Sequence, residues 1–217
     1  MLKPDQPNSY FCAMAWPRLY HTPAIVQQAF AGLTWRKPDN SGRVYLTFDD
    51  GPSPEVTPWL LETLAAYRAK ATFFCVGANA ERYPALLQQI TDQGHQLGNH
   101  TQHHMAGWHV APETYLADAN RAAEAIPSSL FRPPYGQLTP RLARALRSSG
   151  YEVIMWEVLS YDFDQQVDTA KALQKCLTGT RAGSIVVFHD HPKALPQLRA
   201  ILPSYLQQLH EKGYTFV

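Results

Sequence analysis

The chain has 217 residues, of which 45% are hydrophobic and 17% charged, and this composition excludes a disordered or fibrous protein. Lysine and arginine number 19 against 18 for aspartate and glutamate, so the net charge of +1 offers no electrostatic surface for nucleic acid or an anionic membrane. These numbers fit one globular unit with a neutral or small-molecule partner.

The N-terminal part of the chain differs from the rest. A rhythm of strands and helices begins only near residue 43, so we expect residues 1–42 to form an extension packed on the domain of residues 43–217. The early residues contain no apolar segment typical of a signal peptide, which favours a cytoplasmic protein. No stretch approaches the ~18 consecutive apolar residues of a membrane span. Cys12, Cys75 and Cys176 indicate neither a disulfide framework nor a cysteine zinc site.

Short β-rich segments alternate with longer helical segments from residue 43 to the end. The predicted strands are apolar or β-branched runs at 44–48, 71–76, 95–99, 130–132, 152–158, 184–188 and 214–217. Segments with helical spacing lie between most of them, among them 57–70, 83–94, 112–126 and 138–150. Thr139 followed by Pro140 is typical of a helix start. Gly94, Gly150 and Gly213 each stand where a helix should end.

This alternation predicts an α/β fold with a parallel sheet covered by helices on both faces. About seven strand–helix units in one domain favour closure into a barrel, and a doubly wound open sheet is the alternative. No G-x-G-x-x-G motif follows the first strand and no Walker-type lysine loop is present. In either architecture, functional residues gather in the loops beyond the carboxyl ends of the strands.

Polar residues suited to acid–base or metal chemistry follow five of the predicted strands. They are Asp49-Asp50, the histidine-rich segment 98–104, the segment 132–136, the segment 160–163, and His189-Asp190-His191. Their recurrence at five separate strand ends carries more weight than any one of these motifs alone.

The histidine cluster is the first candidate for metal binding. His100 and His104 are four residues apart, so on a helical turn both rings would share a face, and imidazole nitrogen is a good zinc ligand. His103 is an alternative ligand, because a spacing of three can also converge on a metal. Thr101 stands where the zincin motif H-E-x-x-H has its glutamate, which removes the base of a metalloprotease.

A carboxylate from the Asp49-Asp50 pair can complete such a centre. Two histidines and one carboxylate leave coordination positions open, as in a catalytic zinc site. A dication would also relieve the repulsion between the two adjacent charges. A surface turn would explain Gly51 and Pro52 after the aspartate pair. It would not explain why a predicted buried strand leads directly into the pair.

Five motifs occur in a fixed order along the chain: TFDDG, H-T-x-x-H, R-P-P-Y-G, an aspartate followed by an aromatic residue, and an apolar strand ending in His-Asp. Together they resemble the polysaccharide deacetylases of carbohydrate esterase family 4. The resemblance implies that residues 43–217 form a distorted (β/α)7 barrel with parallel strands and outer helices. It also implies a metal-dependent hydrolase that removes acetyl groups from N-acetylated sugars such as chitooligosaccharides or peptidoglycan.

The resemblance assigns roles to the metal-binding side of the site. Asp49 would be the catalytic base and Asp50 a metal ligand, together with His100 and His104. Arg132 would hold the base in place, although an arginine can also form a purely structural ion pair. The expected metal is Zn²⁺, with Co²⁺ and Ni²⁺ as alternatives.

The remaining roles lie on the opposite side of the site. Tyr135 would offer its backbone N–H to the oxyanion, and His189 would be the general acid with Asp162 as its partner. Taken alone, His189 could also be a core histidine at a strand end. Phe163 replaces the tryptophan that many members of the family carry, so the acetyl pocket is expected to differ in shape.

Two other functions remain open at this point. A related metal hydrolase of O-acetyl esters or other amide bonds would use the same water and oxyanion chemistry. A non-catalytic glycan-binding module on the same fold would be expected to lack at least one of the predicted metal ligands, the base or the acid, and none is missing. The expected partner is an acetylated sugar, without nucleic acid and without a membrane span.

Overall fold

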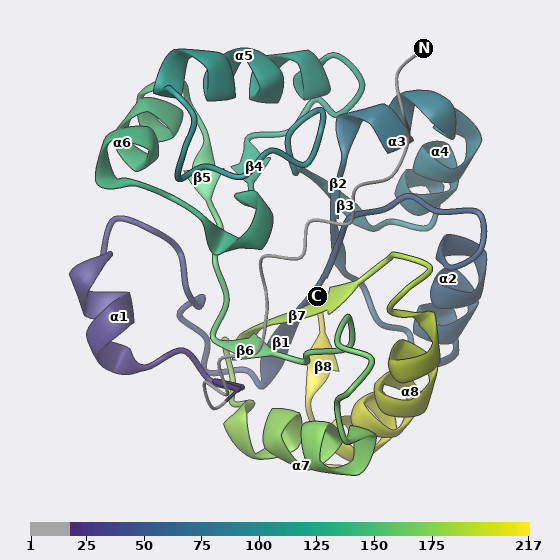
Figure 1. The fold of residues 1–217 in the computed structure, drawn as a ribbon. Helices are drawn as coiled ribbons and strands as arrows, with labels where there is room; N and C mark the ends of the chain where they lie inside the picture. The colour runs from purple at the N-terminus through teal and green to yellow at the C-terminus, as the bar shows by residue number, and fades with distance from the viewer. Residues whose placement is uncertain (1–17) are drawn as a thin grey trace.

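A computed structural model describes residues 18–217, so residues 1–17 of the predicted extension, including Cys12, lie outside the described residues (Figure 1). The strands are β1 Arg43–Asp49, β2 Thr72–Cys75, β3 Gln96–Asn99, β4 Leu130–Phe131, β5 Glu152–Val153, β6 Val158–Leu159, β7 Ile185–His189 and β8 Thr215–Phe216. They form one sheet in the order β5-β4-β3-β2-β1-β7-β6, with β8 paired to β1, and all these pairings are parallel.

Helices surround the curved sheet as an outer ring (Figure 1). The helices are α1 Ala24–Ala29, α2 Thr57–Ala66, α3 Gly77–Arg82, α4 Pro84–Asp92, α5 Pro112–Ala123, α6 Pro140–Ser148, α7 Thr169–Gly179 and α8 Leu195–Glu211. A single 3₁₀ turn, η1, spans Pro134–Gly136. No helix in the described part of the chain is long and apolar enough to cross a membrane. The distorted barrel of parallel strands with outer helices is therefore confirmed.

The central strands are held together by a cluster of aromatic rings. Phe48 of β1 stacks on Phe73 of β2 at 5.3 Å between ring centroids and on Phe188 of β7 at 5.8 Å. Tyr205 of α8 meets Phe188 edge to face. All four side chains are essentially inaccessible to solvent, and burial of a phenylalanine typically contributes about 1.5–3 kcal/mol. The apolar runs of the sequence thus become the buried central strands of the sheet. Because these strands are parallel, their carboxyl ends lie together at one rim.

The predicted strand 152–158 is wrong as a single element. The structure divides it into β5 and β6, which lie at opposite edges of the sheet and are joined by residues 154–157. In this connection the carbonyls of Ile154 and Met155 accept hydrogen bonds from the Arg132 guanidinium, at 3.2 and 3.0 Å, rather than from a neighbouring strand. Because only residues 154–157 join the two edge strands, the sheet must curl until its edges approach each other, which excludes the doubly wound open sheet.

The helix boundary signals of the sequence are confirmed. Thr139 caps α6, and its hydroxyl accepts a hydrogen bond from the backbone N–H of Leu142 at 3.2 Å. Gly94, Gly150 and Gly213 follow α4, α6 and α8 with φ angles of 76°, 91° and 83°. These left-handed conformations favour glycine, because it has no Cβ to clash.

Residues 18–42 lie along the junction between β5 and β6. Single bridges join Thr34 to Ile154 and His21 to Val158, on the two sides of the connection. Between them, the buried carboxylate of Glu157 accepts hydrogen bonds from Ser184, at 2.7 Å, and from Arg181. This described part of the N-terminal extension therefore contacts the barrel where its sheet is interrupted.

Candidate active site

The predicted site residues meet at the carboxyl-end rim of the sheet. Asp49 ends β1 and His189 ends β7, and the two are register partners across the β1–β7 pairing. The histidine segment follows β3, Arg132 follows β4 directly, and Asp162 follows β6 by three residues. Parallel pairing thus gathers on one rim the polar residues that the sequence distributes over five strand ends.

Asp50, His100 and His104 form a group that can hold a metal ion, with one ligand atom from each residue lying within 4.8 Å of the others. His104 Nε2 is 3.0 Å and His100 Nε2 is 3.5 Å from the same oxygen, Asp50 Oδ1. Burial alone would raise the pKa of Asp50, but hydrogen bonding to His100 and His104 holds the pKa of this carboxyl well below its usual range. The carboxylate is therefore ionised, as a metal ligand must be.

The alternative ligand His103 points elsewhere. Its Nδ1 donates to Asp118 Oδ1 at 2.6 Å, and its side chain is 69% exposed. Asp118 also accepts a hydrogen bond from the backbone N–H of His103 at 3.1 Å. The geometry thus places His104, and not His103, beside Asp50.

The histidine segment is a loop and not the helical turn expected from the four-residue spacing. Thr101 and His104 have φ angles of 63° and 53°, which interrupt any helical path. Asn99 Oδ1 accepts from the backbone N–H of Thr101 at 2.9 Å, and the Thr101 hydroxyl accepts from the N–H of Met105 at 3.0 Å. Side chain to backbone hydrogen bonds, rather than a helix, bring His100 and His104 together.

The second ring nitrogen of each histidine also has a fixed partner. His100 Nδ1 donates to the carbonyl of Arg132 at 2.7 Å, and His104 Nδ1 lies 3.0 Å from the hydroxyl of Tyr135. Because a carbonyl only accepts, His100 Nδ1 carries a proton. Its Nε2 hydrogen-bonds to Asp50 when the ring is charged, and offers its lone pair to a cation on the side of Asp50 when the ring is neutral. Two oriented imidazoles and one ionised carboxylate are a donor set that fits a divalent cation.

Arg132 connects the metal group to Asp49. Its fully buried guanidinium donates to Asp49 Oδ1 at 2.7 Å and to the Thr47 hydroxyl at 2.6 Å. It also lies over the ring of Phe74, with 4.2 Å between the guanidinium carbon and the ring centroid. The side chain of Arg132 orients Asp49, while its carbonyl orients His100. The ion pair is therefore part of the site as well as of the barrel closure.

His189 and Asp162 form a second pair at the rim. Asp162 is fully buried and accepts from His189 Nδ1 at 2.7 Å, from the His189 backbone N–H at 2.8 Å and from the Ser160 hydroxyl at 2.8 Å. Burial alone would lower the pKa of His189, but the charge and hydrogen bond of Asp162 outweigh it and raise the pKa to about 9. The imidazole is thus held in its charged form at neutral pH, with the ring of Phe163 packed edge to face against it.

Tyr135 lies in the 3₁₀ turn after β4, in a left-handed conformation with a φ of 59°. The residue is 60% exposed, and its ring meets the ring of His104 edge to face at 4.5 Å between centroids. Among the described residues, no hydrogen bond is formed by the backbone N–H of Tyr135. That N–H group remains available to a substrate oxygen.

Thr47 has a role that sequence reasoning missed. Its hydroxyl accepts from Arg132 and donates to the carbonyl of Val186 on β7 at 2.8 Å. The available signal was a threonine in the otherwise apolar and aromatic run of β1, two residues before the Asp pair. A small polar residue in a buried strand needs a partner, and here the partner is the arginine that also binds Asp49.

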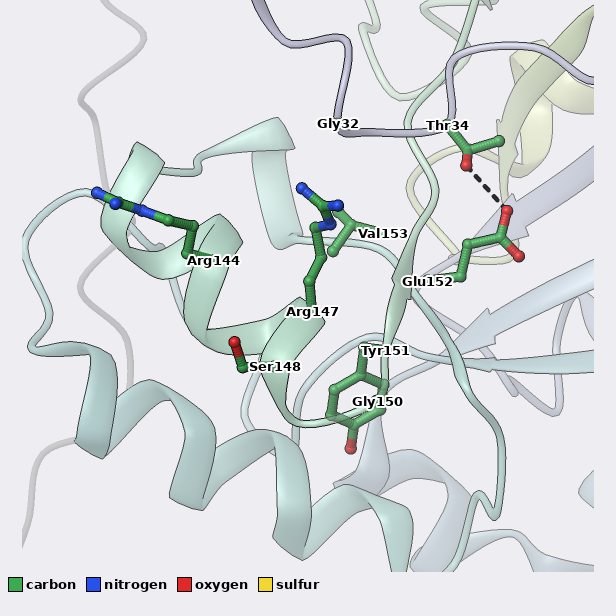
Figure 2. Close-up of a pocket in the computed structure, with 9 residues that line it drawn as sticks. All are labelled: Gly32, Thr34, Arg144, Arg147, Ser148, Gly150, Tyr151, Glu152 and Val153. Atoms are coloured by element: carbon green, nitrogen blue, oxygen red, sulfur yellow. Dashed lines mark hydrogen bonds between the residues drawn. The ribbon is translucent and has the colours of Figure 1, made fainter.

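A pocket of about 630 Å³ lies beside β5, at an edge of the sheet (Figure 2). Residues from α6, the following turn and the extension line it, including Arg144, Arg147 and Gly32. None of the predicted site residues contributes to its wall. This pocket is therefore separate from the rim where the titratable groups converge.

Comparison with known proteins gives relatives with stated activities. Residues 36–154 match the polysaccharide deacetylase family. The chain is 31% identical over 191 residues to a peptidoglycan-N-acetylglucosamine deacetylase of Bacillus cereus, covering 85% of this chain and 90% of the relative. It is 34% identical over 188 residues to a chitooligosaccharide deacetylase of Sinorhizobium fredii, covering 79% and 87%.

Solved structures similar to this chain include members of the same family. The peptidoglycan N-acetylglucosamine deacetylase Bc1960, in complex with 4-naphthalen-1-yl-N-oxidanyl-benzamide, superposes with a TM-score of 0.82 at 28% identity, covering 90% of this chain and 94% of that one. A family 4 carbohydrate esterase from Streptomyces lividans, in complex with acetate, gives a TM-score of 0.73 at 30% identity and covers 82% and 93%.

Proposed function

Since this chain belongs to the polysaccharide deacetylase family, we propose that it is a hydrolase that removes acetyl groups from N-acetylated sugars of the N-acetylglucosamine type. The observation that carries this proposal is the grouping of Asp50, His100 and His104 next to an arginine-held carboxylate. The histidine–aspartate pair at the neighbouring strand end completes the set of groups that amide hydrolysis requires.

We further propose that the metal is zinc, with cobalt and nickel as alternatives. Two imidazole nitrogens and one carboxylate oxygen are suitable ligands for all three ions. When bound, such a cation would polarise the acetyl carbonyl and lower the pKa of a coordinated water to about 7. Asp50, His100 and His104 would hold it, and three protein ligands leave room for water and substrate.

The neighbouring residues supply the proton transfers. Asp49 would accept the proton of the attacking water, since Arg132 occupies only one of its oxygens in the described hydrogen bonds. The N–H of Tyr135 would stabilise the negative charge that develops on the acetyl oxygen. His189 would protonate the sugar nitrogen as the carbon–nitrogen bond breaks, because an unprotonated amine leaves poorly. The products are acetate and a free amino sugar.

Incubation with N-acetylglucosamine oligomers tests this function directly. We expect acetate release and a matching gain of free amine, loss of both after treatment with a chelator, and recovery when zinc is added. O-acetylated xylose serves as a parallel substrate. Acetate from the ester alone would support an esterase instead, and no acetate from any acetylated sugar would support a non-catalytic glycan-binding module.

The pairing of His189 with Asp162 predicts a specific pH dependence. Because Asp162, with smaller contributions from the charges of Asp50 and Asp49, raises the pKa of His189 to about 9, the acid stays protonated up to about that pH, and kcat should fall only above it. In Asp162→Asn the falling limb should move down towards pH 6.5, the ordinary pKa of histidine. Profiles of kcat from pH 6 to 10 with metal-saturated enzyme measure this shift.

Asp164→Asn is the matched control for that profile. Asp164 lies on the same loop, but its carboxylate pairs with Arg18 at the surface. Its variant should keep the wild-type alkaline limb. An unchanged alkaline limb in Asp162→Asn would show that His189 is not the acid whose proton limits the reaction.

A further inference from the structure

Asp190 is a buried carboxylate at the site that none of the proposed steps uses. It follows His189 directly and is completely inaccessible to solvent. Its Oδ2 accepts a hydrogen bond from the Thr57 hydroxyl at 2.6 Å, while its Oδ1 has no partner among the described residues. Since burying a carboxylate is costly unless it is well paired, a half-satisfied one calls for a local explanation.

The hydroxyl of Thr57 links Asp190 to the turn after the Asp pair. The backbone N–H of Ser53 donates to Thr57 Oγ1 at 2.7 Å, and the same hydroxyl donates its proton to Asp190. The N–H of Thr57 in turn donates to the carbonyl of Ser53 at 2.9 Å. A chain of hydrogen bonds therefore runs from the turn, through the first residue of α2, to the residue after β7.

The main chain of Asp190 holds the other end of the same segment. Its backbone N–H donates to the carbonyl of Asp49 at 2.7 Å. Asp190 thus holds the chain on both sides of Asp50. Its backbone N–H binds Asp49, and its carboxylate is linked through Thr57 to the turn at Ser53. Its side chain also lies flat against Gly51, where an added Cβ would be only 2.2 Å from Asp190 Oδ2.

Asp50, between these two contacts, has an unusual backbone conformation. Its φ of 78° is uncommon for a residue other than glycine and must be maintained by its surroundings. This conformation turns the chain out of β1, so that Asp49 and Asp50 can both face the rim. The side chain of Asn79 holds the carbonyl of Asp50 at 2.8 Å, and the Asp190 contacts hold the residues on either side.

We propose that Asp190 is a positioning residue, which together with Thr57 fixes the turn that presents Asp50 to the metal. The inference rests on the proposed function only in so far as Asp50 is a metal ligand. It predicts that the Asp190 carboxylate contributes to metal affinity without touching the metal. It also explains why this turn has glycine at position 51, since a side chain there would displace the carboxylate.

Metal affinity of the full chain is the measurement that tests the proposal. Stripped protein is titrated with zinc in competition with a chromogenic chelator. We expect Asp190→Ala to bind zinc about 10- to 100-fold more weakly than wild type, the usual effect of removing a residue that supports a ligand. Thr57→Val should weaken binding in the same way. Thr57→Ser, which keeps the hydroxyl, should remain close to wild type.

Glu157→Gln provides the matched control. Glu157 is also a buried carboxylate that accepts from a hydroxyl, that of Ser184, but it supports the barrel closure instead of the Asp50 turn. It should lower thermal stability and leave zinc affinity unchanged. If Asp190→Ala does not fold, Thr57→Val decides. Wild-type zinc affinity in folded Thr57→Val, or an equal loss of affinity in Glu157→Gln, would overturn the proposal.

The readout separates this proposal from the proposed function. Zinc affinity is measured without substrate, so a protein that binds zinc but releases no acetate would contradict the function alone. Conversely, active wild-type enzyme together with unchanged zinc affinity in folded Asp190→Ala and Thr57→Val would contradict the positioning role alone.

Discussion

Replacing Asp49 by asparagine is expected to reduce kcat for acetate release about 10²- to 10⁴-fold while the protein keeps its metal. Asparagine has nearly the same shape and can still accept the hydrogen bond from Arg132, but it cannot take a proton from water. Asp49 does not belong to the group that can hold the metal, so metal content should be unchanged. The effect should therefore fall on kcat and leave metal binding alone.

Acetate release and metal content, measured on the same preparation, check this expectation. Asp39→Asn is a suitable control, because Asp39 lies just before β1 and its carboxylate binds only Ser41 and Arg43 in the described hydrogen bonds. That variant should release acetate at the wild-type rate. Wild-type turnover in Asp49→Asn would show that another group is the base.

Replacing His104 by alanine is expected to abolish stoichiometric metal binding, and with it acetate release. The variant leaves two ligands of the three that the structure brings together. His103 cannot easily replace the lost ring, because Asp118 holds it by two hydrogen bonds. Metal content should fall from about one divalent ion per chain to a small fraction of that value when the protein is dialysed against metal-free buffer.

His103→Ala is the matched variant for this experiment. It removes a histidine from the same loop and should leave metal content at the wild-type level. Full metal content in His104→Ala, combined with loss in His103→Ala, would reverse the ligand assignment. Loss in both variants, with folded protein, would indicate that the loop as a whole and not His104 alone determines binding.

The strands and the rim could be predicted because apolar runs mark buried strands and the polar residues follow them directly. The segment 152–158 shows where this reasoning fails. Its pattern is that of one strand, but Arg132, twenty residues earlier, binds the carbonyls of Ile154 and Met155 and interrupts the ladder. A distant side chain that binds backbone groups leaves no signal in local periodicity.

The structure brings together the three residues that the sequence predicts as metal ligands, but in a loop and not on a helical turn. Spacings of three and four were both compatible with a metal, and sequence could not choose between His103 and His104. The choice depends on Asp118 in α5, which holds His103 away, and on the left-handed conformations of Thr101 and His104. The roles of Thr47 and Asp190 could not be predicted for a related reason: the sheet alone brings their partners to them.

Zinc titration of the metal-free chain, with acetate release from N-acetylglucosamine oligomers followed at each addition, tests the central claim most directly. We predict that the rate rises in proportion to added zinc, stops rising at about one zinc per chain, and stays near background in His104→Ala at every addition. Acetate release at the full rate before any zinc is added, or an equal response in His104→Ala, would contradict a deacetylase built on Asp50, His100 and His104.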